Sequence, residues 1–253
     1  MNFIGLYTIF RKETDRMIRV YMQALLSPVV TTVLYFVVFG SAIGTHIAPI
    51  NGITYEQFIV PGLIMMALLT NALSAASSGI YFPKFLGTTY EFLSAPLSFF
   101  EITLGYMLAA VLRALLIGII IFIVALFFTP VPVAHPFAAF FFAFLTAAAF
   151  SLFGIIIGIW ADNFERLSLF PLLVITPLSF LGGVFYTVDM LPPFWQKIVL
   201  INPIIYMIDG LRYSFFGIAD IDPLISVALI LIFLAMCIGL LAWIFKTGYR
   251  LKN

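Results

Sequence analysis

Few side chains in this chain of 253 residues could do chemistry, because 64% of its residues are hydrophobic and 9% are charged. The two histidines, His46 and His135, fall in predicted loops, and no H-E-x-x-H zinc pattern occurs. The single cysteine, Cys237, excludes an intrachain disulfide and a cysteine-based metal site. No G-x-x-x-x-G-K-[ST] loop is present to bind nucleotide phosphates. These absences argue against an intramembrane enzyme and against an ATP-hydrolysing motor.

The polar groups of most interest lie inside apolar runs. Arg113 stands some ten residues into the run 103–128. At about 1.5 Å per residue the guanidinium could lie near mid-membrane, where an unpaired charge is costly and usually functional. If the helix instead begins well inside the cytoplasm, Arg113 reaches only the lipid headgroups, and the sequence favours neither alternative. Asn71, Ser74 and Ser78 form a small polar face, for which helix packing is the simpler interpretation and a substrate conduit the sharper one.

The composition places these groups in a membrane protein. Mean hydropathy is +1.18, and an ordinary soluble domain is roughly a quarter charged. The net charge of +1 excludes nucleic-acid binding through a general basic surface. Apolar residues precede Arg11 and Lys12, the reverse of the order in a secretory signal, so we expect the N-terminus to be retained.

Residues 1–26 predict an amphipathic helix at the cytoplasmic membrane surface. Apolar residues recur there at close to helical period, and cations cluster on the opposite side, near anionic lipid headgroups. The cations of this predicted interface helix are Arg11, Lys12, Arg16 and Arg19.

The remainder, 27–253, predicts an all-α membrane domain with six transmembrane helices, since a crossing needs about 20 apolar residues. The expected spans are 28–44, 58–81, 103–128, 137–160, 167–186 and 223–245. Nine Lys and Arg residues fall on one side of this arrangement and two on the other. By the positive-inside rule both termini are cytoplasmic. Gly154 and Gly158 form a small-xxx-small pattern that predicts close packing with another helix.

The loop between the second and third expected spans predicts a short helix of about two turns. T-T-Y-E at 88–91 fits a capping box, Gly87 precedes it, and Pro96 ends what begins there. Such a helix is unstable alone in water, so we expect a partner or the membrane surface to hold it. It comprises Thr88, Thr89, Tyr90, Glu91, Phe92, Leu93 and Ser94.

The stretch 177–217 is apolar, but glycines, prolines and charges break it before it reaches the length of a span. Broken backbone at membrane depth needs protein around it or a cavity beside it. We therefore expect a segment that enters the membrane without crossing; an apolar external loop is the alternative.

Five motifs together give a specific resemblance over nearly the whole chain. They are F-I-V-P-G-L-I-M-M (58–66), L-G-G-V-F-Y (181–186), M-L-P-P-F-W (190–195), N-P-I-I-Y (202–206) and D-G-L-R (209–212). With them the chain resembles the ABC-2 type permease family, and especially the bacterial export permeases of the YadH type. The resemblance implies a type V exporter-like fold, a coupling helix on Thr88–Ser94 and a re-entrant helical hairpin at about 190–212.

The resemblance also implies a function. The chain would be the permease subunit of an ATP-binding cassette exporter in the bacterial inner membrane, moving a drug-like, lipid or glycan substrate. It would form a homodimer with two copies of a separate ATPase, which binds ATP and Mg, and would itself hold no cofactor. An ion-driven secondary transporter is the alternative, but it requires carboxylates buried within spans, and the acidic residues lie mostly in loops and near helix ends.

Overall fold

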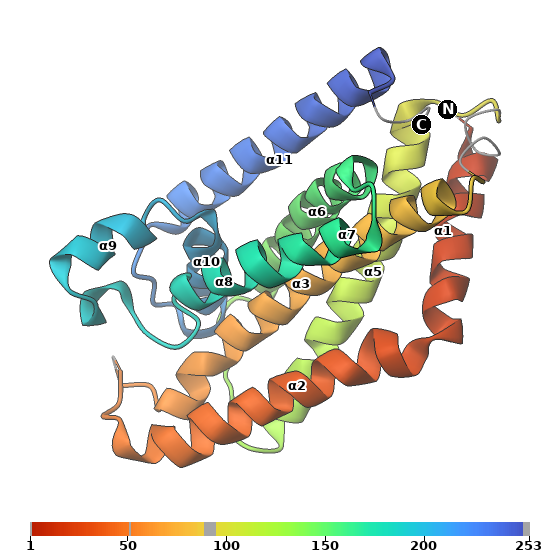
Figure 1. The fold of residues 1–253 in the computed structure, drawn as a ribbon. Coiled ribbons are helices and arrows are strands. Elements are labelled where there is room, and N and C mark those ends of the chain that lie inside the picture. The colour runs from red at the N-terminus through yellow and green to blue at the C-terminus, as the bar shows by residue number, and fades with distance from the viewer. Residues whose placement is uncertain (1, 51, 89–94, 250–253) are drawn as a thin grey trace.

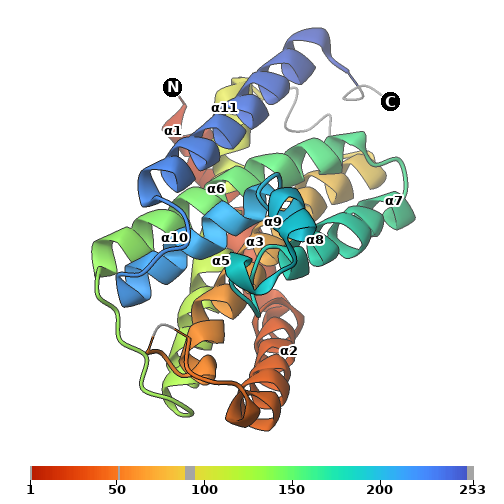
Figure 2. The ribbon, with the colours of Figure 1, turned by 90° about the vertical axis from the view of Figure 1, so that its left-hand side faces the viewer.

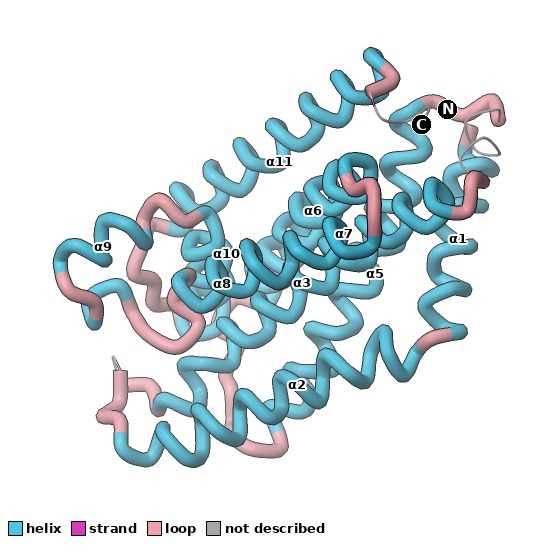
Figure 3. Tube along the Cα trace, in the orientation of Figure 1, coloured by secondary structure: helices cyan, strands magenta, loops and turns pink. Residues whose placement is uncertain are grey.

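The computed structural model describes residues 2–50, 52–88 and 95–249, which are predominantly helical (Figure 1). The α-helices before the midpoint of the chain are α1 (Phe3–Arg19), α2 (Ser27–Tyr35), α3 (Tyr55–Phe85) and α5 (Phe99–Leu126). Those after it are α6 (Pro136–Trp160), α7 (Phe164–Leu169), α8 (Thr176–Leu181), α9 (Pro193–Val199), α10 (Pro203–Phe216) and α11 (Pro223–Thr247). Segments of π-helix flank α2 at Met22–Leu26 and Phe36–Ile43 and join α7 to α8 at Phe170–Ile175. Figure 3 shows the loops gathered toward the ends of the long helices.

Six helices within the described residues are long and apolar enough to cross a membrane, as the sequence predicted. They are Met22–Gly40, Tyr55–Phe85, Phe99–Leu126, Pro136–Trp160, Phe164–Leu181 and Pro223–Thr247.

Most boundaries differ from the predicted ones by a few residues, and three of the differences have a clear local reason. The first spanning helix begins at Met22 instead of 28, because α-helical and π-helical turns run on without a break. The third begins at Phe99 instead of 103, because Ser98 and Glu101 form a capping box before it. The fifth ends at Leu181 instead of 186, because the chain turns at Gly183, whose φ is +82°.

The centre of the bundle is the contact between α3 and α6, which run side by side in both ribbon views (Figures 1 and 2). Gly154 and Gly158 of α6 face the backbone of α3, as their spacing predicted. A Cβ atom at Gly158 would lie 2.5 Å from the carbonyl oxygen of Ser77, and one at Gly154 would overlap the carbonyl oxygen of Leu73. The two helices therefore approach as closely as glycine allows.

Helix α1 packs against the first half of α5. Its buried side chains recur every four residues, at Ile9, Glu13 and Met17. Gly105 of α5 allows close contact, because a Cβ there would lie 2.9 Å from Ile9 Cβ. In Figures 1 and 2 the start of α1 and the end of α11 lie at the same end of the bundle.

Helices α9 and α10 lie at the opposite end of the bundle, where the sequence predicted a hairpin at about 190–212 (Figure 1). They are bent by 89° relative to each other, the geometry of a broken span or a re-entrant loop. Asn202 forms the corner: its side-chain oxygen caps the Ile204 amide at 3.1 Å, and its side-chain nitrogen donates to the Leu178 carbonyl at 2.6 Å. The motif N-P at 202–203 thus starts α10 and ties it to α8.

Candidate functional site

A groove with a volume of about 540 Å³ runs beside α3, between it and the α7–α8 segment. Serine and threonine side chains of α3 form one wall, and apolar side chains of the α7–α8 segment form much of the other. Arg113 of α5 also lines it. The lining residues include Thr70, Ser74, Ser77, Ser78, Phe82, Arg113, Phe164, Leu167, Leu172 and Thr176.

Three of the four predicted pathway residues therefore share this groove. Ser74, Ser78 and Arg113 line it, although Arg113 comes from a different helix. Asn71 does not: it is buried and its amide donates to the Ala67 carbonyl at 2.8 Å. For Asn71 the packing interpretation fits the structure.

Arg113 lies near the middle of the 28-residue helix α5. Its Nε is buried and has no hydrogen-bond partner among the described residues. Arg113 also lines a cavity of about 30 Å³ between α1, α3 and α5, to which Glu13 and Arg16 contribute. The guanidinium thus lies between the charged face of α1 and the groove.

The hydroxyl groups of the groove are mostly committed to their own helix. Thr70 donates to the Met66 carbonyl at 2.7 Å, Ser78 to the Ala75 carbonyl at 3.1 Å, and Ser77 to the Ser74 carbonyl at 3.3 Å. A hydroxyl that donates its proton to a backbone carbonyl still has oxygen lone pairs that can accept a hydrogen bond from a ligand. This wall can therefore accept hydrogen bonds from a bound molecule.

The buried face of α1 carries a carboxylate that sequence reasoning missed. Glu13 is 7% exposed and lies 2.7 Å from Arg16 and 3.7 Å from Lys12. Burial raises the pKa of Glu13 above its ordinary value of 4.5, and the two cations oppose that rise. The i, i+4 repeat with Ile9 and Met17 could have indicated that Glu13 faces the bundle.

Three of the motifs quoted above meet at the other end of the bundle. Arg212 of D-G-L-R donates from Nη2 to the Gly183 carbonyl at 2.6 Å and lies over the ring of Phe58. Asp209 accepts hydrogen bonds from the Asp220 amide at 3.1 Å and the Ile221 amide at 2.9 Å. Asp209 and Arg212 are both buried, 3.8 Å apart. This cluster ties α10 to α3, to the turn after α8 and to the start of α11.

Comparison with known proteins agrees with this arrangement. A family model described as "ABC-2 type transporter" matches residues 5–216, which include the residues that line the groove, the α1 contact and the side chains of Asp209 and Arg212. The chain belongs to the ABC-2 type transporter family.

Individual members of the ABC-2 family also match. The chain is 42% identical over 254 residues to "Inner membrane transport permease YadH" of Escherichia coli K12, covering 100% of this chain and 99% of that protein. It is 28% identical over 217 residues to "Nodulation protein J" of Rhizobium leguminosarum bv. viciae, covering 82% of this chain and 79% of that one. The likeness to YadH spans both chains almost end to end.

The coupling helix that the ABC-2 resemblance implies falls mostly outside the described residues. Of its members, Thr88 is described: its amide donates to the Pro83 carbonyl at 2.9 Å, in the turn that ends α3. Residues 89–94, which hold Thr89, Tyr90, Glu91, Phe92, Leu93 and Ser94, lie outside the described residues.

The predicted cations of α1 divide into two groups. Lys12 and Arg16 face Glu13, whereas Arg11 is exposed and pairs with Asp15 at 3.9 Å. Arg19 is exposed too, and its Nε donates to the backbone carbonyl of Asp15 at 3.4 Å. Lys12 is exposed and Arg16 half-buried, and they lie 6.0 Å from the ring centroids of Tyr106 and Phe82, on the bundle side of α1.

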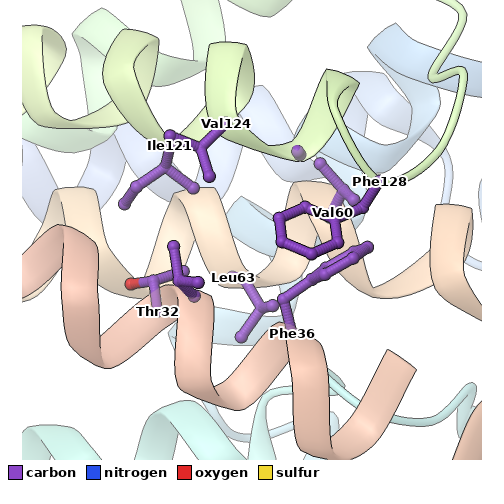
Figure 4. Close-up of a pocket in the computed structure, with 9 residues that line it drawn as sticks. Thr32, Phe36, Val60, Leu63, Ile121, Val124 and Phe128 are labelled. Atoms are coloured by element: carbon purple, nitrogen blue, oxygen red, sulfur yellow. The ribbon is translucent and has the colours of Figure 1, made fainter. Parts of the chain in front are cut away.

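A second cavity, between α2, α3 and α5, is not a ligand site (Figure 4). Its volume is about 10 Å³, room for at most one water molecule. The polar side chain in its lining is that of Thr32, whose hydroxyl already donates to the Pro28 carbonyl at 2.9 Å. The other labelled lining residues are Phe36, Val60, Leu63, Ile121, Val124 and Phe128.

Proposed function

We propose that this chain is the membrane-spanning permease subunit of an ATP-binding cassette exporter, located in the bacterial inner membrane. The observation that carries the proposal is the groove along α3, which hydroxyls and a mid-helix arginine line in an otherwise apolar bundle. A charged side chain such as Arg113 is expensive at such depth and marks a functional site more often than a packing contact. Membership of the ABC-2 family and the likeness to the E. coli transport permease YadH support the same function.

The energy source is a second protein. The chain carries no G-x-x-x-x-G-K-[ST] loop, so it has no phosphate-binding loop of that kind for ATP. ATP and Mg therefore bind to a partner ATPase, and this chain needs no cofactor of its own. Two copies of the permease with two ATPase subunits form the complex, with the groove of each copy facing the other across a central route.

Both termini are placed in the cytoplasm, from the bias of nine cations to two across the six spans. In that orientation the α9–α10 pair is external, and the loop between α3 and α5 is internal. Reporter fusions at Gly52, Ala134 and Lys197 should then read external, and fusions at Gly87 and Asn253 internal. An external Gly87 would contradict both the topology and the coupling assignment.

Force passes from the ATPase through the segment Thr88–Ser94. If this segment folds as a capped helix on docking, Glu91→Ala removes a cap worth about 1 kcal/mol, and ATPase association falls several-fold. Phe92→Ala removes apolar contact and weakens association too. Phe137→Ala is the matched control, because Phe137 is 93% exposed and lies at the start of α6, away from this loop.

The test is pull-down of the ATPase encoded beside the permease, at equal membrane insertion, followed by native mass spectrometry. We expect a complex of two permeases and two ATPases, reduced by Glu91→Ala and Phe92→Ala and unchanged by Phe137→Ala. A stable monomeric permease that recovers no ATPase would contradict the proposal.

The ion-driven alternative has less support. Among the described residues the buried carboxylates are Glu13, Glu101 and Asp209. Glu13 pairs with Arg16, Glu101 caps α5, and Asp209 accepts two backbone amides. None of the three lines the groove, where a coupling ion would have to meet the substrate.

A further inference from the structure

We infer that the groove binds an amphiphile with an anionic headgroup, whose charge is held by Arg113 and whose apolar part lies against the α7–α8 wall. This inference rests on the proposed function, because it names the class of substrate that the same groove would take. It is drawn from the charge, the hydrogen-bonding capacity and the walls of the groove.

The first step concerns the unmet hydrogen-bonding capacity of Arg113. A guanidinium has five N–H donors and cannot be neutralised by losing its proton in a protein. The Nε of Arg113 is buried with no partner among the described residues, and no carboxylate is among the side chains that line the groove. A buried donor without a partner is costly, so a ligand that supplies an acceptor there binds favourably.

The second step concerns the charges around Arg113. On the α1 side Glu13 is the nearby carboxylate, but Arg16 lies 2.7 Å and Lys12 3.7 Å from it. The single negative charge of Glu13 is therefore already outnumbered by the two positive charges of Lys12 and Arg16, and Arg113 adds a third. The region carries net positive charge, which attracts an anion and repels a cation.

The third step concerns the walls. Phe82, Phe164 and Leu172 line the groove and are 40%, 62% and 65% exposed. A free inorganic anion leaves these apolar surfaces uncovered, whereas an alkyl chain packs against them and gains dispersion contacts. The volume of about 540 Å³ suits a drug-sized or single-chain molecule.

The fourth step concerns the hydroxyl wall. Thr70, Ser77 and Ser78 donate hydrogen bonds to backbone carbonyls of α3, so toward the groove they can act as acceptors. They do not compete with Arg113 for the anion. They match donor groups, such as hydroxyls, elsewhere on the headgroup.

The test is equilibrium binding of radiolabelled dodecyl phosphate to the purified full chain, without ATPase, in a neutral maltoside detergent. We expect Arg113→Gln to weaken binding by about tenfold or more, since charge-assisted hydrogen bonds are the strong ones. Arg113→Lys keeps the positive charge, so it should lose less affinity for dodecyl phosphate than Arg113→Gln. Lys197→Gln is the control, because it removes one exposed cation on α9 and should change nothing.

Two further probes separate the headgroup from the chain. Dodecyltrimethylammonium has the same tail with a cation and should bind more weakly than dodecyl phosphate. Inorganic phosphate lacks the tail and should bind more weakly as well. Ser78→Phe fills the groove while leaving Arg113 in place, and should reduce dodecyl phosphate binding.

Equal dodecyl phosphate affinity in the wild type and Arg113→Gln would overturn the inference. So would binding of inorganic phosphate or of dodecyltrimethylammonium as tightly as dodecyl phosphate. Because the assay contains no ATPase, these results leave the proposed permease function standing. Conversely, failure to recover an ATPase would contradict that function and leave the binding result intact.

Discussion

The guanidinium carbon of Arg212 lies 4.0 Å from the centroid of the Phe58 ring, in a buried cation–π contact between α10 and α3. The same guanidinium donates to the Gly183 carbonyl. Cation–π contacts strengthen when both partners are shielded from water. Arg212 therefore holds the bent α9–α10 pair against the spanning helix that lines the groove.

Replacing Arg212 should destabilise the fold. Arg212→Ala removes the donor to the Gly183 carbonyl and leaves Asp209 buried without its cation, and breaking a buried pair costs about 3 to 5 kcal/mol. Arg212→Lys should recover only part of the lost stability, because an ammonium group cannot reproduce the planar array of donors of a guanidinium. The measurement is thermal unfolding in detergent, with Arg166→Ala at an exposed ion pair as the control. Equal melting of Arg212→Ala and Arg166→Ala would contradict this role.

The number of spans could be predicted from the sequence, because each long apolar run is bounded by charges, prolines or glycines. The contact of Arg212 with Phe58 and Gly183 could not be predicted, because Phe58 lies more than a hundred positions from the other two and such a contact leaves no local pattern. The broken segment was predicted to enter without crossing, and the bend between α9 and α10 fits either a re-entrant loop or a broken span, so this stays a prediction. Its 89° corner at Asn202 and Pro203 follows from a cap and a helix start that can be recognised locally.

The α3–α6 contact should tolerate no added atoms at Gly154. A Cβ there overlaps the Leu73 carbonyl, and backbone cannot move aside as a flexible side chain could. Gly154→Ala should cost about 1 to 3 kcal/mol through overpacking. Gly239→Ala on α11 is the matched control, because nothing lies within 4 Å of its Cβ position and alanine favours helix. Thermal unfolding of both variants checks this, and a loss of the same size in Gly239→Ala would contradict it.

The charges of the site were the hardest part to predict. Arg113 stood out because it interrupts an apolar run, and Ser74 and Ser78 because they share a helix face. Glu13 was concealed by its cationic neighbours, which make that part of α1 look like a solvated face. Glu101 could have been placed, because S-x-x-E at 98–101 is a capping box that the sequence displays.

Glu13 should make stability depend on pH in a particular direction. Burial raises the pKa of Glu13, so the folded protein binds its proton more readily than the unfolded chain does. The stability that the protonated Glu13 contributes is fully present below pH 4.5, the ordinary pKa of a glutamate. It is lost as the pH rises through the raised pKa of Glu13 in the folded protein.

The corresponding measurement is thermal unfolding of the wild type and Glu13→Gln between pH 4.5 and pH 8. The wild type should lose more stability across this range than Glu13→Gln, whose side chain does not titrate. Other titrating groups cancel in the difference between the two proteins. Parallel curves, or a wild type that gains stability relative to the variant as the pH rises, would contradict the assignment.

The central claim is that this chain is a permease worked by a separate ATPase, and ATP hydrolysis in proteoliposomes tests it most directly. The ATPase encoded beside the permease is reconstituted alone, with the wild type, and with Glu91→Ala at equal protein content. The account predicts that the wild type changes the hydrolysis rate of the ATPase and that Glu91→Ala weakens this effect. A rate that is the same with and without the permease, at substrate concentrations that saturate the groove, would contradict it.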